Sequence, residues 1–274
     1  MTNAKTGMAA HTESKEMIDS VLFKVNKMER EGNISFPSRY NPGNALRSAW
    51  LQIQETKDLN ERPALEVCTK ESVANALLNT VIQGLSPAKK QVYYIVYGNQ
   101  LQAQRSYFGT MAATKRIPGV VDVWADVVYE GDQFQAKKVH GGWQVIQHES
   151  APENIDPTKI RYAYAVIERE DEEPFTDVMT WAQIQQSWAK SRSKAQTVHK
   201  EFPDQMAKRT VINRACKMFF NASDDSDQLI DAFNATGDRI EVEAHDLPVA
   251  EKARLDALND ELTGSSGEGG NGNE

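Results

Sequence analysis

Residues 85–116 read LSPAKKQVYYIVYGNQLQAQRSYFGTMAATKR and contain five basic residues, four tyrosines and one phenylalanine but no acid. They lie inside a window of 50 residues, from Ser72 to Val121, that has no Asp or Glu, although the chain of 274 residues has 39 acids. A groove that binds phosphates excludes carboxylates, and its Lys and Arg displace the counterions of a polyanion. The stretch therefore favours a nucleic-acid ligand. A half-buried sheet and helix that happen to lack acids is the structural alternative.

The same stretch predicts a β-hairpin followed by a short helix. Gln91–Tyr97 is rich in Tyr, Val and Ile, and the turn dipeptide Gly98-Asn99 makes residues 100–105 the returning strand. Ser106 can cap a helix that ends before Ile117-Pro118, because the residue before a proline avoids helical geometry.

On the N-terminal side, apolar residues at helical spacing predict helices over residues 14–30, over 44–57 and after Thr69. On the C-terminal side, residues 120–129, 133–139 and 143–147 predict a meander of antiparallel strands, and residues 160–169 a further strand that ends the sheet. Helices are expected over 180–190 and 203–220.

The predicted fold class is α+β, with a small antiparallel sheet, a hairpin plus a meander, flanked by helices. An N-terminal helical arm precedes it, and an acidic, partly disordered C-terminal tail follows it. We divide the chain into a disordered N-terminus (1–12), a helical arm that packs on its own core or on a second copy (13–35), a DNA-binding core (36–220) and an acidic partner-binding region (221–274).

Charge is distributed unevenly along the chain. The net charge is -8, but the residues from Met218 to the end have 14 acids against 3 basic residues. A second basic stretch, Val178 to Lys217, has eight Lys and Arg against Glu201 and Asp204. This asymmetry is typical of a binding body with an acidic extension.

The two basic stretches supply the candidate DNA contacts, and Tyr107 is the aromatic residue favoured for base stacking. For the helical cations the alternative is an ordinary solvated helix face, and for the tyrosines it is core packing. The candidates are Lys89, Lys90, Arg105, Tyr107, Lys115, Arg116, Lys190, Arg192, Lys194, Lys208, Arg209, Arg214 and Lys217.

Other classes of function lack their sequence signals. No apolar run is long enough for a membrane span and the N-terminus lacks a secretory signal, so we expect a cytoplasmic protein. Cys68 and Cys216 are too few for a disulfide framework or a zinc site. The phosphate loop G-x-x-x-x-G-K-[ST] is absent, the five histidines lack metal-ligand spacing, and acids 168–173 suggest a solvated turn rather than a nuclease centre. We expect no catalytic residue, metal or cofactor.

Several segments in this order and spacing resemble the RecT family of phage and prophage single-strand annealing proteins. They are GLSPAKKQVYYIVYGN around residues 84–99, VVYEGDQF (127–134), YAVIERED (164–171), VMTWAQIQQSWAKSRSKA (178–195) and MAKRTVINRACK (206–217).

The resemblance implies a protein that binds single-stranded DNA and the annealed duplex, and that anneals complementary strands without ATP. It also implies a homo-oligomer in the form of a ring or helical filament, with a phage exonuclease and the host single-strand binding protein as partners. A passive single-strand DNA-binding protein and a metal-dependent nuclease are the alternatives.

Overall fold

The computed structural model describes residues 2–189, 199–223 and 227–237, with the side chains of residues 2–14 and 227 left out. The described residues up to Thr236 form one compact unit. This unit contains these elements: α1 (Thr2–Arg30), α2 (Pro42–Glu55), α3 (Ala64–Val67), α4 (Lys70–Ile82), η1 (Pro87–Lys89), β1 (Val92–Tyr97), β2 (Gln100–Arg105), α5 (Tyr107–Thr114), β3 (Val120–Tyr129), β4 (Gln133–Val139), β5 (Gly142–Glu149), η2 (Pro152–Asn154), β6 (Ile160–Arg169), β7 (Phe175–Thr180), α6 (Trp181–Ala189), α8 (Pro203–Asn221) and α9 (Asp227–Ala235).

Helix α1 packs on α2 and α4 of its own chain. Val21 and Val25 are buried in the common core, and Ile18 and Leu22 pack against it, while Phe23 on the opposite side is 67% exposed. The sequence predicts that this apolar stripe packs either on the chain's own core or on a second copy, and in the structure it packs on the chain's own core. The helix also begins at Thr2, so residues 2–12 are helical where the composition predicts disorder.

The hairpin and helix predicted around Gly98 are confirmed. β1 pairs with β2 from Val92↔Arg105 to Tyr97↔Gln100. Gly98 has a φ of 61°, a left-handed conformation that glycine adopts without strain. Ser106 precedes α5, and its hydroxyl oxygen accepts the Gly109 N–H at 3.2 Å.

The strand order differs from the predicted meander. β3 pairs with β6, and β6 pairs with β7, whereas β4 and β5 pair only with each other among the described strands. The chain leaves the sheet after β3 at a turn in which the Asp132 carboxylate accepts the Tyr129 N–H at 2.7 Å. The sheet also contains β7, which the sequence does not predict, because the acidic turn after β6 indicates the end of the sheet.

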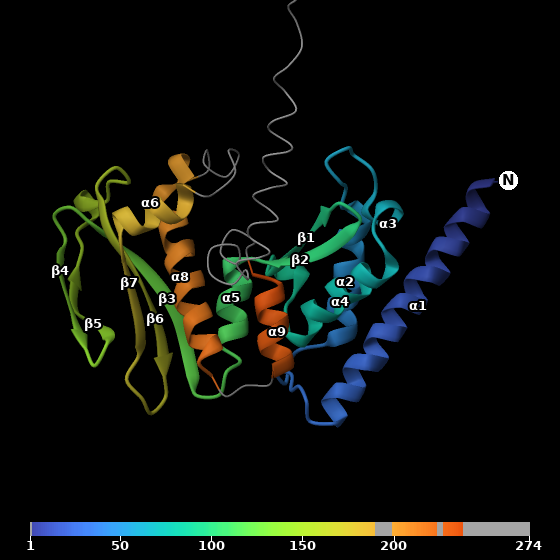
Figure 1. Ribbon diagram of the computed structural model, residues 1–274, viewed down its shortest axis with the longest axis horizontal. Helices are drawn as coiled ribbons and strands as arrows, with labels where there is room; N and C mark the ends of the chain where they lie inside the picture. The colour runs from blue at the N-terminus through green and yellow to red at the C-terminus, as the bar shows by residue number, and fades with distance from the viewer. Residues whose placement is uncertain (1, 190–198, 224–226, 238–274) are drawn as a thin grey trace, which may run out of the picture. The chain divides into compact units, whose positions relative to one another are not determined.

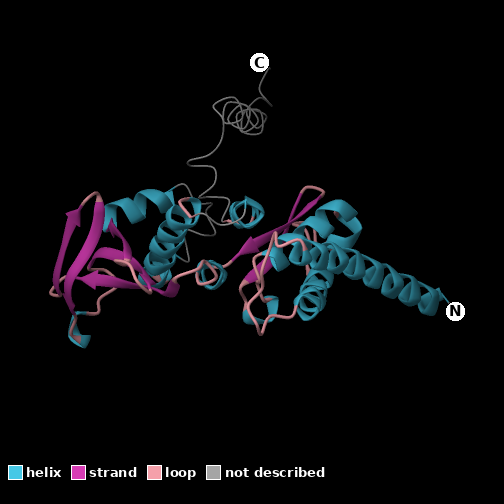
Figure 2. Ribbon diagram, turned by 90° about the horizontal axis from the view of Figure 1, so that it is seen from below, coloured by secondary structure: helices cyan, strands magenta, loops and turns pink. Residues whose placement is uncertain are grey.

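The sheet β3-β6-β7 is covered on both faces. Alternate residues of β6 point to opposite sides: Ala163, Ala165 and Ile167 join the main core with α8, while Tyr164 and Val166 join a smaller cluster under the β4–β5 hairpin. Figures 1 and 2 show this β-rich part with α6 and α8, and the β1–β2 hairpin with α1–α4; α5 and α9 lie between them. The α+β class with small antiparallel sheets flanked by helices is confirmed.

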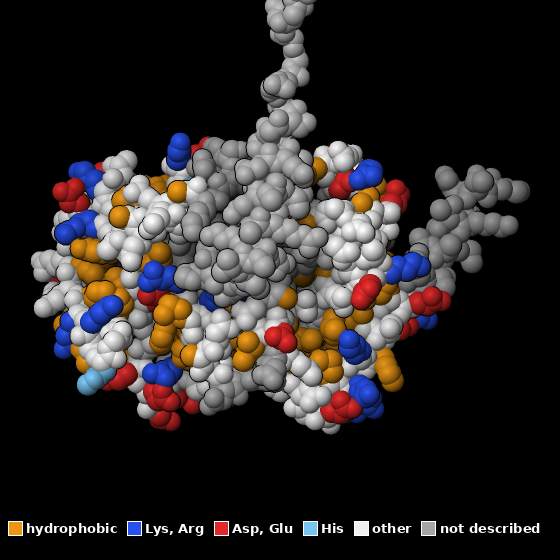
Figure 3. Space-filling model, in the orientation of Figure 1, with side chains coloured by type: hydrophobic (Ala, Val, Ile, Leu, Met, Phe, Trp, Pro, Cys, Tyr) orange, Lys and Arg blue, Asp and Glu red, His pale blue; other side chains and the backbone are white. Residues whose placement is uncertain are grey.

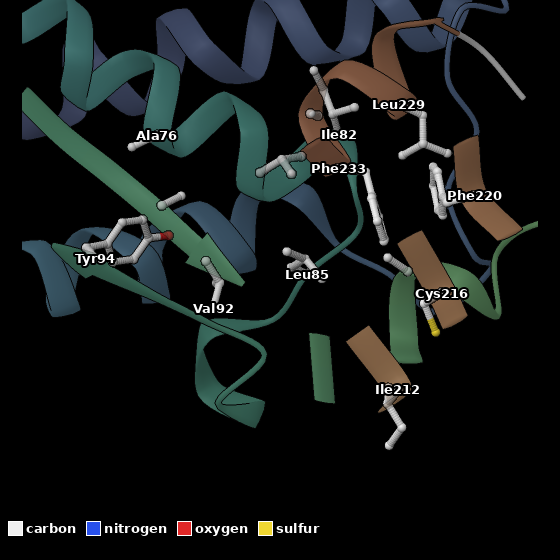
Figure 4. Packing of buried hydrophobic residues seen from close by; sticks show 14 of the residues in the cluster. Ala76, Ile82, Leu85, Val92, Tyr94, Ile212, Cys216, Phe220, Leu229 and Phe233 are labelled. Atoms are coloured by element: carbon white, nitrogen blue, oxygen red, sulfur yellow. The ribbon is translucent and has the colours of Figure 1, made fainter. Parts of the chain in front are cut away.

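Helix α9 is part of this core, although the sequence placed it in the acidic C-terminal region. Leu229 and Phe233 of α9 are buried against Phe220 of α8, and the rings of Phe220 and Phe233 stack with centroids 3.9 Å apart (Figure 4). Thr236 just beyond the helix is fully buried. The compact unit therefore ends at Thr236 and not at Phe220.

Candidate nucleic-acid interface

The first turn of α5 is held tightly against the segment that leads into β1. A Cβ on Gly109 would lie 2.0 Å from the Gln91 carbonyl oxygen, so only glycine permits this approach. The Ser106 hydroxyl donates to the Lys90 carbonyl at 2.7 Å. These contacts fix the backbone of Lys90 beside the start of α5, where Tyr107 and Phe108 follow.

Tyr107 and Phe108 form an aromatic pair with ring centroids 4.1 Å apart. The Phe108 side chain is 52% exposed, whereas Tyr107 is half-buried. Burial raises the pKa of the Tyr107 hydroxyl, and the charges of Arg209 and Lys208 act in the opposite direction. Helices α5 and α8, which carry these residues, are in contact. A hydrophobic ring that remains half exposed beside cations is suited to stack on a base.

Two lysines of this region form ion pairs with aspartates of β3. Lys208 Nζ on α8 lies 2.9 Å from Asp126, and Lys115 just after α5 pairs with Asp122. Together with the contact between α5 and α8, these pairs bring the candidates of both basic stretches onto one surface. We call it the α5–α8 surface; it consists of Lys90, Tyr107, Phe108, Lys115, Lys208 and Arg209.

Arg105 does not lie on that surface, because its guanidinium is buried. Nη1 donates to Gln83 at 2.7 Å, to the Phe233 carbonyl at 2.7 Å and to Thr236 at 2.9 Å, and Nε donates to Thr110 at 3.0 Å. The residue is 6% exposed. Arg105 therefore joins β2, α4, α5 and α9 in the core and has no open path to a phosphate.

Arg116 and Arg214 also hold elements together. Arg116 donates to the carbonyls of Ile82 and Ser35, which ties the end of α5 to α4 and to the loop after α1. Arg214 of α8 makes a bidentate pair with Asp177 of β7, with both nitrogen–oxygen distances at 2.6 Å. These two arginines are half-buried, and their guanidinium groups already have partners in the fold.

The remaining candidates fall into two groups. Lys89 is exposed at the end of η1, and Lys217 is half-buried on α8. Lys190, Arg192 and Lys194 lie outside the described residues. Trp188 and His199 are described residues on either side of that segment, and their rings stack with centroids 4.6 Å apart. The indole N–H of Trp188 also donates to the Thr210 hydroxyl of α8 at 2.8 Å.

Asp122 and Asp126 are the functional candidates that the sequence missed. Both aspartates occupy polar positions in the alternating pattern of β3. The lysine partner of each belongs to another element, so the local sequence does not identify either aspartate as part of a site. Figure 3 shows basic and hydrophobic side chains interspersed over the β-rich part of the visible face.

Within the described ranges, no three His, Cys, Asp or Glu side chains are placed to share a metal ion. No described helix is long and apolar enough to cross a membrane.

A surface that combines Lys and Arg with half-exposed aromatic rings on an α+β scaffold is suited to bind nucleic acid. Residues 43–246, more than half of the chain, match the model of the RecT family. The chain belongs to the RecT family, whose members act in DNA recombination by binding DNA and annealing single strands. A comparison with curated proteins found no matching relative.

Proposed function

We propose that the chain binds single-stranded DNA through the α5–α8 surface and anneals complementary strands without ATP. The observation that carries the proposal is the contact between α5, which has the Tyr107–Phe108 pair, and α8, which has Lys208 and Arg209. Cations hold the sugar-phosphate backbone, and the half-exposed Phe108 ring offers a sequence-tolerant stacking surface. Membership of the RecT family supports annealing as the outcome of binding.

In this mechanism the protein makes and breaks no covalent bond. Lys and Arg reduce the repulsion between two phosphate backbones, and the bases that remain accessible sample pairing registers. Base pairing then supplies all the sequence specificity. Assembly of several subunits into a ring or filament aligns successive surfaces along the strand.

The proposal extends to the cellular context that the family suggests. The chain acts in the bacterial cytoplasm with a phage exonuclease that exposes single strands, and with the host single-strand binding protein. The acidic region after Thr236, with ten acids and three basic residues, is the proposed contact for these partners.

Binding to labelled oligo(dT) at a series of salt concentrations tests the first step. The logarithm of the affinity should fall against the logarithm of salt concentration with a slope near -0.7 per neutralised phosphate. Lys208→Ala and Arg209→Ala should weaken binding and reduce this slope, whereas Lys137→Ala on the exposed side of β4 should change neither. An affinity that does not depend on salt would contradict the surface.

Annealing is tested with two complementary oligonucleotides, without ATP, and with strand length checked on a denaturing gel. Full-length duplex formed faster than in buffer supports the proposal. Tight binding without faster annealing would indicate a passive single-strand DNA-binding protein, and shortened strands would indicate a nuclease.

A further inference from the structure

Asp122 and Asp126 occupy equivalent positions on the exposed edge of the sheet. β3 pairs with β6 on one side only among the described strands, so its outer N–H groups face away from the sheet. The Asp122 carboxylate accepts the N–H of Val123 at 2.7 Å, and the Asp126 carboxylate accepts the N–H of Val127 at 2.9 Å. The two carboxylates are four residues apart, about 13 Å along a strand.

Each carboxylate holds, with the same oxygen, one lysine of the α5–α8 surface. Asp122 Oδ1 pairs with Lys115, and Asp126 Oδ1 lies 2.9 Å from Lys208 Nζ. The Lys115 pair and the hydrogen bond from Val123 also keep the pKa of Asp122 below its usual range. Both lysines are therefore paired with acids that belong to the chain.

In these two pairs the lysine can exchange its carboxylate for another anion, unlike the arginine in the pair Arg214–Asp177. The side chains of Lys208 and Asp126 are 33% and 46% exposed, and those of Lys115 and Asp122 are 40% and 48% exposed. Exposed single-bridge pairs are weak. Asp177, which holds Arg214 with two hydrogen bonds, is only 6% exposed, and breaking that pair leaves a buried charge.

Loss of the lysine does not leave either carboxylate without a hydrogen bond. The N–H of Val123 or Val127 still donates to it, and the carboxylate remains partly in water. The lysine, on a flexible stem, can turn from the carboxylate to a phosphate of the same charge sign. Each carboxylate is therefore hydrogen-bonded both when its lysine is paired with it and when that lysine binds a phosphate.

We propose that Asp122 and Asp126 are internal competitors of the DNA phosphates for Lys115 and Lys208. This inference rests on the proposed function, because it concerns the same surface. A phosphate that binds Lys115 or Lys208 must displace the carboxylate paired with that lysine, so the two aspartates lower the affinity for single-stranded DNA. A strand held this weakly can leave and re-register, as annealing requires.

Substitution of Asp126 by asparagine tests this role. It removes the charge but keeps the hydrogen bond from the backbone, since the amide oxygen still accepts the Val127 N–H. Asp126→Asn should raise the affinity for oligo(dT) about two- to fivefold at ~0.1 M salt, the range expected for one exposed ion pair. Glu61→Gln is the matched control, because Glu61 forms an exposed pair with Lys57 at 3.1 Å in the loop after α2. It makes the same change in net charge and should leave the affinity unchanged.

A double-mutant cycle separates competition from plain repulsion of DNA by a nearby acid. If Asp126 acts by holding Lys208, then Asp126→Asn has no effect when Lys208→Gln is already present; the same holds for Asp122 and Lys115. An increase of equal size in both backgrounds, or no increase in either, overturns the inference. Failure of the unmodified protein to bind oligo(dT) would instead contradict the proposed function. Thermal melting of each variant verifies that the fold is retained.

Discussion

The guanidinium carbon of Arg105 lies 3.5 Å from the centroid of the Phe233 ring, across 128 residues of sequence. A cation over an aromatic face is attracted to it, and the same guanidinium also donates to the Phe233 carbonyl. The end of the compact unit is thereby attached to β2, which directly precedes the Tyr107–Phe108 pair. This relationship decides where the chain can be shortened.

We predict that a chain ending at Gly237 folds and binds single-stranded DNA at least as tightly as the full chain. It retains Phe233 and Thr236 but lacks ten acids and three basic residues, so competition with phosphate decreases. A chain ending at Phe220 removes two partners of Arg105, the Phe233 carbonyl and Thr236, and should have a lower melting temperature. Circular dichroism melting and oligo(dT) binding on both truncations provide the measurement. Equal stability of the two would show that α9 adds nothing to the core.

Phe233→Ala should lower the free energy of unfolding by about 3 to 5 kcal/mol, because the ring is almost fully buried against Phe220. Phe202→Ala provides the control, since that ring is 55% exposed. Urea unfolding of both variants decides the matter, and similar losses in the two would contradict the packing described for α9.

Helix α1 should contribute to stability through its buried stripe. Val25→Ala removes two fully buried methyl groups and should lower the free energy of unfolding by about 1 to 2 kcal/mol, at ~0.8 kcal/mol for each carbon. Phe23→Ala changes an exposed side chain of the same helix and should cost little. If Phe23→Ala instead reduces oligomer size in light scattering while melting stays normal, the outer side of α1 contacts a second copy.

The basic residues should separate into two groups on substitution. Arg105→Ala and Arg214→Ala should lower the melting temperature, because each leaves buried polar partners unsatisfied. Lys208→Ala and Arg209→Ala should weaken DNA binding with little change in melting. Normal melting of the Arg105 variant together with weakened binding would restore it to the DNA contacts.

Stability should also fall in acid through Asp132. Burial alone would raise the pKa of this carboxyl, but hydrogen bonds from Tyr129, Ser150, Asn154 and His148 together lower it. A pKa that is lower in the folded state stabilises the fold above the usual carboxyl pKa, near 4, and this contribution is lost as the pH falls through the folded value. Urea unfolding between pH 5 and pH 3 should show a smaller decline for Asp132→Asn than for the unmodified chain. An identical decline would remove Asp132 as a source of the acid sensitivity.

The sequence by itself determined the local elements, because their signals span only a few residues. Gly98-Asn99 sets the β1–β2 turn, Ser106 caps α5 through the Gly109 N–H, and the ten-residue runs of β3 and β6 have the predicted bounds. The acid-free window and its cations also indicate a polyanion ligand, since charge can be counted directly from the sequence.

Only the tertiary structure decided the role of each cation and the partner of each strand. Arg105 and Lys208 have the same charge in the sequence. In the structure, however, α9 covers Arg105, whereas Lys208 reaches Asp126 on the exposed edge of β3. β3 pairs with β6 and not with the nearer β4, because pairing depends on which faces must be buried and not on distance along the chain. A side chain's burial and its ion-pair partner depend on segments more than 80 residues away, as Asp126 and Lys208 illustrate, and no local pattern records them.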